Sequence, residues 1–229
     1  TIEAKAAALR RVSDLCRPET IISSTTSTIL VETLSQFVTH PERFINAHWL
    51  NPAYLIPLVE VSPGSKTSAG TTNRLKSLLE SVGKVPVVCK ASPGFIVPRI
   101  QSLVMNEAAR MVEEGVASAA DIDKAVRIGM GLRFATMGPV EFIDWGGGDI
   151  LYFASRYLTE ALGSDRFSAP AIIEQNMETG RIGMDAGQGF YDFESMDTDQ
   201  YRKNMLSRFV GQLRQLELLT APGAALKIV

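Results

Sequence analysis

Two residues whose side chains suit acid–base chemistry, His48 and Glu60, lie twelve positions apart in this sequence. His48 is one of only two histidines in 229 residues. It follows the strand-like run 44–47, and the pair Asn51–Pro52 then ends that run. A second apolar run, 54–61, carries Glu60 near its end. An imidazole oriented by a carboxylate is the smallest unit that does general acid–base work near neutral pH.

If the two runs are strands joined by a polar turn, His48 lies at a strand end and Glu60 returns towards it. A histidine beside apolar residues can also be purely structural, and spacing alone leaves that alternative open for His48. A carboxylate on a strand, with no lysine or arginine nearby in sequence, needs a buried partner. The other histidine, His40, precedes Pro41 and Glu42 and is typical of a solvated loop.

A third candidate, Ser27, lies in the hydroxyl-rich segment 25–28, directly after a short apolar strand predicted at 20–24. Parallel sheets place ligand-binding loops at the carboxyl ends of their strands. The competing interpretation is that Ser27 caps a helical segment beginning at Thr28, a role that the neighbouring hydroxyls could equally take.

Helices alternate with short β-branched runs over the first 92 residues, which indicates a parallel α/β sheet. Periodicity predicts helices at 2–16, 29–37 and 68–82, and strands at 20–24, 44–47, 54–61 and 85–89.

The character of the sequence changes at 91–94, and strand signals are almost absent after Phe95. The predicted organisation is therefore an α/β piece over residues 1–92 followed by an all-helical domain over residues 93–229. The glycine run 146–149 lacks the preceding strand and the lysine of a phosphate-binding loop, so we expect a turn between helices. Helices are predicted at 96–114, from Ser118 onward, at 139–161, at 168–180 and at 199–219.

The composition excludes several classes of protein. Hydrophobic residues make up 45% and charged residues 21%, as in ordinary globular proteins, and a net charge of −2 gives no electrostatic case for nucleic acid or an anionic membrane. No apolar run reaches the ~18 residues of a membrane helix. Cys16 and Cys89 are too few for a disulfide framework or a metal site, which favours a cytoplasmic protein with reduced thiols and no metal. The start, Thr1–Lys5, is neither a signal peptide nor an initiator methionine, so the chain is expected to begin inside a domain.

Several motifs, in the right order, resemble those of the L-3-hydroxyacyl-CoA dehydrogenase family over residues 1–193. The resemblance implies the C-terminal part of a Rossmann-type, dinucleotide-binding sheet domain over 1–92, and a helical substrate and dimerisation domain over 93–229. It also implies NAD as cofactor and a homodimer. The family's glycine-rich loop and acidic ribose ligand are absent from this sequence. The matching segments are 24–28 (STTST), 48–52 (HWLNP) with 58–61 (LVEV), 93–97 (PGFIV), 137–141 (MGPVE) and 187–191 (GQGFY).

The activity that this resemblance implies is hydride transfer between the nicotinamide and the 3-hydroxyl of an L-3-hydroxyacyl-CoA, such as 3-hydroxybutyryl-CoA, in fatty acid metabolism. His48 would act as general base and Glu60 would orient its imidazole, as in a serine-protease triad. Ser27 would donate a hydrogen bond to the substrate oxygen and contact the cofactor. Lys5 would lie near the cofactor, and Asn51 would contact the nicotinamide or the substrate.

Three departures from the family pattern favour a second candidate, a dehydrogenase of a small free hydroxy acid. Pro98 stands where the CoA-using members carry a substrate-binding asparagine, although a proline also suits the first turn of a helix. The segment 131–134 (GLRF) resembles relatives that oxidise carnitine, gulonate or a pyridine carboxylate. Arg133 would pair with a substrate carboxylate there, or is a surface arginine. Asp185 stands where some relatives carry a lysine near the cofactor. A third candidate, from another class, is a non-enzymatic helical dimerisation module.

Overall fold

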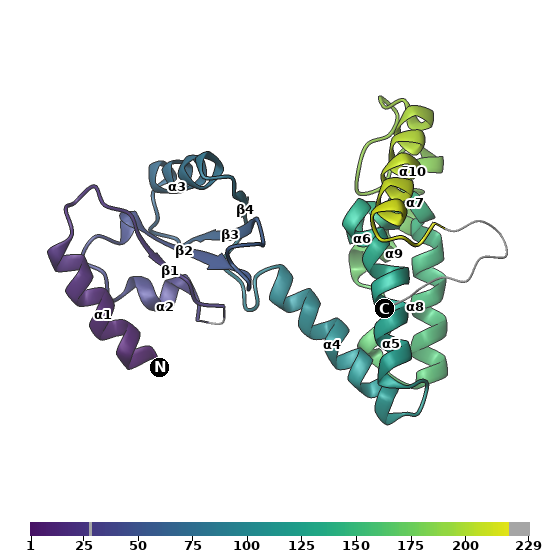
Figure 1. Cartoon of the computed structure of the whole chain (residues 1–229), viewed down its shortest axis with the longest axis horizontal. Helices are drawn as coiled ribbons and strands as arrows, with labels where there is room; N and C mark the ends of the chain where they lie inside the picture. The colour runs from purple at the N-terminus through teal and green to yellow at the C-terminus, as the bar shows by residue number, and fades with distance from the viewer. Residues whose placement is uncertain (28, 220–229) are drawn as a thin grey trace. The chain divides into compact units, whose positions relative to one another are not determined.

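The computed structural model describes residues 1–27 and 29–219. The chain forms two compact units, Thr1–Val116 and Ala117–Val229 (Figure 1). The first unit includes helix α4 (Val97–Glu113), which the predicted boundary between residues 92 and 93 assigns to the second domain. That boundary stays a prediction.

The first unit is built on a four-stranded sheet in the order β1-β2-β3-β4. β1 (Ile22–Ser24) pairs parallel to β2 (Phe44–Trp49), β2 pairs antiparallel to β3 (Leu58–Pro63), and β3 pairs parallel to β4 (Val85–Val88). The prediction of a parallel sheet is correct for the two outer pairs and wrong for the central pair. The connection between β2 and β3 is too short for the crossover that a parallel pair needs. The carboxyl ends of β1 and β2 therefore share one sheet edge with the amino ends of β3 and β4.

Helices cover both faces of this sheet (Figure 1). Ile45 and Ala47 of β2 pack in one cluster with residues of α3, while Phe44 packs in another with residues of α2. Because side chains alternate along a strand, Asn46 and His48 lie on the same face as Phe44. The first unit contains α1 (Ile2–Leu15), α2 (Val31–Ser35), the 3₁₀ turn η1 (Pro41–Arg43), α3 (Ala69–Ser81) and α4.

A buried arginine ties α1 to the sheet. Arg43, which directly precedes β2, is 4% exposed, and its guanidinium donates to the carbonyl of Ser13, at 2.8 Å, and to that of Arg17. These carbonyls lie at the end of α1 and just beyond it, where backbone acceptors lack partners within the helix. A cation is also favoured at that helix end.

The second unit is helical throughout the part that the structure describes, apart from isolated β-bridges among Gly183, Gln188 and Asp192. The prediction of an all-helical region is therefore confirmed for this unit. The prediction of a single helix over 139–161 is wrong. Gly147, at φ 97°, divides this range into two helices, in agreement with the predicted turn at 146–149. The elements are α5 (Ala119–Ala125), the π-helix η2 (Val126–Gly131), α6 (Leu132–Thr136), α7 (Pro139–Gly146), α8 (Gly148–Leu162), η3 (Asp165–Phe167), α9 (Ala171–Glu178), η4 (Met184–Ala186) and α10 (Thr198–Gln215).

The glycine-rich segment 180–189 leads to a buried carboxylate of α7. Asp144 is 2% exposed and accepts hydrogen bonds from the backbone nitrogens of Phe190, at 3.0 Å, and Tyr191, at 2.8 Å. A Cβ on Gly189 would lie 2.2 Å from Oδ1 of this carboxylate, so only glycine fits. The segment and this carboxylate thus form a structural clasp in the second unit.

None of the helices in the described part of the chain is both long and apolar enough to cross a membrane. Cys16 and Cys89 are both free thiols.

Candidate active site

His48 and Glu60 stand directly opposite each other in the antiparallel ladder of β2 and β3. Nδ1 of the imidazole lies 2.7 Å from Oε2 of the carboxylate. Both residues are buried, at 7% and 1% exposure. The structure thus brings together the two residues that the strand–turn–strand spacing predicts to be close.

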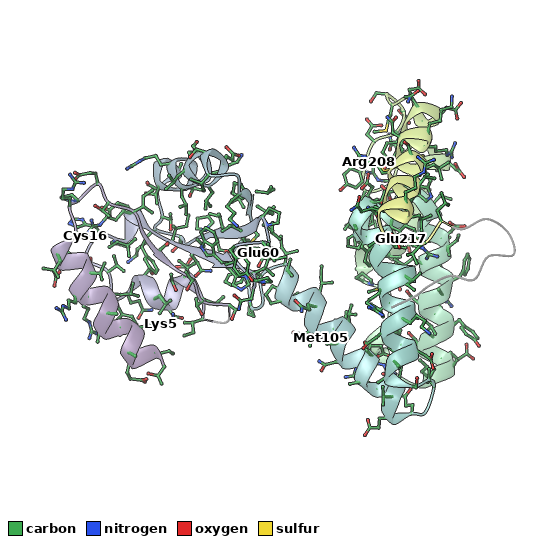
Figure 2. All side chains as sticks on the ribbon, in the orientation of Figure 1. Lys5, Cys16, Glu60, Met105, Arg208 and Glu217 are labelled. Carbon is green, nitrogen blue, oxygen red and sulfur yellow. The ribbon has the colours of Figure 1, made fainter. Side chains whose placement is uncertain are left out.

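The other oxygen of Glu60 is bound by the start of α4. Oε1 accepts hydrogen bonds from the backbone nitrogens of Ile96, at 3.0 Å, and Val97, at 2.8 Å. Figure 2 shows Glu60 at the end of the sheet from which α4 leaves. A helix N-terminus presents unpaired N–H groups, and Glu60 accepts hydrogen bonds from two of them.

The contacts of Glu60 decide which nitrogen of His48 carries its proton. An ionised carboxylate can only accept hydrogen bonds, so Nδ1 of His48 is the donor of the pair. Nε2 of the neutral imidazole is then left with its lone pair, ready to accept a proton.

Phe95 completes the surroundings of the imidazole. Its ring stacks on that of His48, with centroids 5.7 Å apart and planes inclined by 27°. Phe95 is buried and adopts φ 44°, a left-handed conformation that is uncommon for a bulky residue. This conformation, after Gly94 at φ 75°, turns the chain so that the ring meets His48 and the next two N–H groups meet Glu60.

Sequence reasoning missed these partners, the Phe95 ring and the N–H groups of Ile96 and Val97. The motif 93–97 is visible in the sequence as a Pro-Gly turn before a helix. Its contact with a carboxylate 36 and 37 positions earlier is not encoded in any local spacing.

Ser27 and Asn51 follow β1 and β2, at the sheet edge where the carboxyl ends of these strands lie, and both are exposed. The interpretation of Ser27 as a helix cap is wrong, because the N-cap of α2 is Leu30. The hydroxyl of Thr26 accepts a hydrogen bond from the backbone nitrogen of Ile29 at 3.0 Å. Thr28, the predicted start of the helical segment, lies outside the described residues.

The remaining predicted site residues lie on other elements. Lys5 is half-buried on α1, where Figure 2 labels it. Arg133 belongs to α6 in the second unit, where its guanidinium lies over the ring of Phe142, 5.5 Å from the centroid.

Two departures from the family pattern also have local roles in the structure. Pro98 lies in the first turn of α4, as its helix-starting role predicts. Asp185 forms an ion pair with Arg202.

The polar groups at this sheet edge fit one end of a nicotinamide dinucleotide. The hydroxyl of Ser27 and the amide of Asn51 are exposed hydrogen-bonding groups at the carboxyl ends of strands, where Rossmann-type sheets bind such ligands. The described residues hold no group of three or more histidine, cysteine or acidic side chains that could bind a metal.

Two family models match the chain one after the other. Residues 1–92 match "3-hydroxyacyl-CoA dehydrogenase, NAD binding domain", and residues 94–193 match "3-hydroxyacyl-CoA dehydrogenase, C-terminal domain".

Individual relatives agree with these models. The chain is 32% identical over 217 residues to the 5-formyl-3-hydroxy-2-methylpyridine 4-carboxylate 5-dehydrogenase of Mesorhizobium japonicum, covering 94% of this chain and 70% of that one. It is 33% identical to a probable 3-hydroxybutyryl-CoA dehydrogenase of Deinococcus radiodurans, covering 80% and 65%. The crystal structure of a 3-hydroxyacyl-CoA dehydrogenase of Archaeoglobus fulgidus superposes with a TM-score of 0.81 at 32% identity, covering 96% and 74%.

The chain spans only part of each of these relatives, from 40% of a 3-hydroxyadipyl-CoA dehydrogenase of Escherichia coli to 74% of the Archaeoglobus protein. The two matched family models and the similarity over most of the chain nevertheless agree on its descent. The chain belongs to the 3-hydroxyacyl-CoA dehydrogenase family.

Proposed function

We propose that the protein transfers a hydride between the 3-hydroxyl-bearing carbon of an L-3-hydroxyacyl-CoA, of the 3-hydroxybutyryl-CoA type, and NAD. The observation that carries this proposal is the buried hydrogen bond between His48 and Glu60, which leaves Nε2 of the imidazole available. A cytoplasmic location and a place in fatty acid metabolism belong to the same proposal.

In the proposed oxidation, Nε2 of His48 takes the proton of the substrate hydroxyl while a hydride leaves the carbon that bears this hydroxyl. NAD, when bound, supplies the hydride acceptor. Glu60 holds the imidazole and stabilises its cationic form, and the backbone nitrogens of Ile96 and Val97 keep the carboxylate in place. Ser27 donates a hydrogen bond to the substrate oxygen, Asn51 contacts the nicotinamide or the substrate, and Lys5 contacts the cofactor. In reduction, the imidazolium returns the proton.

The histidine pair of this chain offers a matched test in the full-length protein. His48→Ala should lower kcat for 3-hydroxybutyryl-CoA by about 10²–10⁴-fold, because general-base catalysis contributes that much. His40→Ala is the control, because His40 is exposed and pairs with the exposed Glu42, at 3.2 Å. Turnover by His48→Ala equal to that of the control would refute the assignment.

A second candidate is oxidation of a small free hydroxy acid. It is favoured by Pro98 and Arg133, and by similarity to the Mesorhizobium enzyme over 94% of the chain. In this alternative Arg133 pairs with the substrate carboxylate, so Arg133→Met should raise KM for free acids and leave KM for acyl-CoA unchanged. Comparing kcat/KM for 3-hydroxybutyryl-CoA with those for carnitine, gulonate and a hydroxymethylpyridine carboxylate decides between the two.

We also propose that the protein is a homodimer through its helical domain. No residue of α4 is buried, and α8 exposes Ile150, Phe153 and Tyr157 at helical spacing. Apolar stripes of this kind mark protein interfaces. Sedimentation equilibrium should give a dimer mass, and Phe153→Glu should shift it towards the monomer. If the protein is a dimer and His48→Ala leaves its dehydrogenase activity unchanged, the result would favour the non-enzymatic dimerisation module.

A further inference from the structure

The loop 50–57, between β2 and β3, carries Asn51 at the sheet edge beside His48. Strand pairing ends at Trp49 and Val59, so the ladder does not hold this loop. Within the loop, the backbone nitrogens of Leu55 and Ile56 both donate to the carbonyl of Pro52, at 3.0 Å. Its tip is open to solvent, with Tyr54 at 84% and Leu55 at 67% exposure.

A single lysine side chain spans this loop. Nζ of Lys84 donates to the carbonyl of Ala53, at 2.6 Å, and to that of Ile56, at 3.0 Å. The same ammonium lies over the indole ring of Trp49, 5.5 Å from its centroid. No carboxylate among the described residues lies within ion-pair distance of Lys84.

Lys84 is itself well anchored. Its backbone nitrogen donates to the carbonyl of Leu79, in the last turn of α3, at 2.9 Å. The next residue, Val85, begins β4 and donates to the carbonyl of Pro57, at 2.9 Å. Because β3 runs opposite to β2 and β4 runs with β3, the start of β4 lies at the same sheet edge as the end of β2.

We propose that Lys84 is a positioning residue for this active-site loop and acts through Asn51 without touching the substrate. Its ammonium links the carbonyls of Ala53 and Ile56 to the indole of Trp49. The backbone of Lys84 is in turn bound to the last turn of α3. The role of Asn51 in this inference rests on the proposed function. The effect of Lys84 on the order of the loop does not.

The order of the loop can be measured without activity. Proteolysis of a folded protein requires local opening, and chymotrypsin cleaves after exposed residues such as Tyr54 and Leu55. Lys84→Met should speed cleavage at these bonds by about tenfold, because the loop loses its link to α3 and Trp49. Lys84→Arg should cleave at nearly the native rate, since a guanidinium can also donate to two carbonyls and stack on an indole.

Lys76→Met is the matched control. Lys76 lies on α3, is half exposed, and its ammonium pairs with Glu80 at 3.8 Å, away from the loop. It should alter neither cleavage nor activity. If Lys84→Met does not fold, Lys84→Gln takes its place. Its amide keeps one donor group, so chymotrypsin should cleave the loop faster than in the native protein, by less than about tenfold.

The link to Asn51 is tested by a double-mutant cycle in the full-length protein. Lys84→Met alone should lower kcat/KM by about tenfold. In an Asn51→Ala background the same change should have little further effect, because a residue that acts through Asn51 has nothing left to position. If Lys84→Met is cleaved at the native rate, Lys84 does not order the loop. If the effects of Lys84→Met and Asn51→Ala on kcat/KM are additive, Lys84 does not act through Asn51. Failure of the proposed function itself would appear separately, as full activity in His48→Ala.

Discussion

The backbone nitrogen of Val97 lies 2.8 Å from Oε1 of Glu60, so the first turn of α4 binds the carboxylate that orients His48. The arrangement of His48 and Glu60 therefore depends on two separate parts of the first unit. β2 and β3 set the two side chains opposite each other, and the turn before α4 fixes the carboxylate from the other side.

Glu60→Gln keeps the shape of the side chain and removes its charge. If the amide oxygen still accepts from Ile96 and Val97, the amide nitrogen faces Nδ1 of His48 and makes it an acceptor. The imidazole then carries its proton on Nε2 and cannot act as a base, so kcat should fall about 10³–10⁴-fold. Steady-state kinetics measure the loss, and Glu80→Gln on α3 is the control. A loss no larger than that of the control would contradict this account.

Phe95→Leu removes the aromatic partner of the imidazole and keeps an apolar side chain. Ring stacking contributes about 0.5–1.5 kcal/mol, which corresponds to at most about a tenfold change in kcat. We expect a loss of that size, together with a destabilisation of about 1–2 kcal/mol for the smaller buried side chain. Kinetics and urea unfolding measure the two effects. An unchanged kcat with the same destabilisation would show that the ring serves packing alone.

Asp144→Asn tests the clasp in the second unit. One carboxylate oxygen accepts from each of the backbone nitrogens of Phe190 and Tyr191, so an amide group must turn a donor against one of them. Hydrogen bonds to a charged group contribute about 1.5–3 kcal/mol, and we expect a loss of free energy of unfolding in that range. Urea denaturation measures it. The control, Asp123→Asn, changes an exposed side chain and should stay within about 0.5 kcal/mol of the native protein.

Tyr201 makes the stability of the second unit sensitive to alkaline pH. Burial, and then its hydrogen bond to the carboxylate of Glu141, raise the pKa of Tyr201 above its ordinary value. A pKa raised on folding gives stability that is fully present below the unfolded pKa of about 10 and is lost as pH rises towards the folded pKa.

Tyr201→Phe should therefore destabilise the protein at neutral pH and reduce the further loss of stability above about pH 10. Urea unfolding across that pH range measures both effects. Tyr157→Phe is the control, because Tyr157 is 70% exposed. Parallel curves for Tyr201→Phe and the native protein would contradict the expectation.

The spacing of the two strands is enough to predict that His48 and Glu60 are neighbours, because strands joined by a short connection pair with each other antiparallel. The direction of pairing is predicted correctly for β1 with β2 and for β3 with β4, but not for the central pair, because alternating helices and strands suggest parallel strands throughout. The helical character of the second unit followed from its apolar periodicity and glycine stops. The break at Gly147 followed from local backbone chemistry.

Two buried charged residues, Arg43 and Asp144, were not found by sequence reasoning. Arg43 and Asp144 carry charges that local patterns assign to the surface, yet both are nearly inaccessible to solvent. Their partners are backbone N–H and C=O groups, which nearly every residue type carries, so the sequence does not identify them. The same is true of the N–H groups that bind Glu60, and of the carbonyls that bind Lys84.

The contacts of Glu60 also become available in a set order while the chain is being made. Its imidazole partner precedes it by 12 positions, whereas its two amide partners follow it by 36 and 37. At a synthesis rate of about 5–20 residues per second, those amides are added roughly 2–7 s after the carboxylate. A nascent chain can thus pair its two strands early. The carboxylate acquires its remaining partners only when the polypeptide beyond Phe95 has left the ribosome.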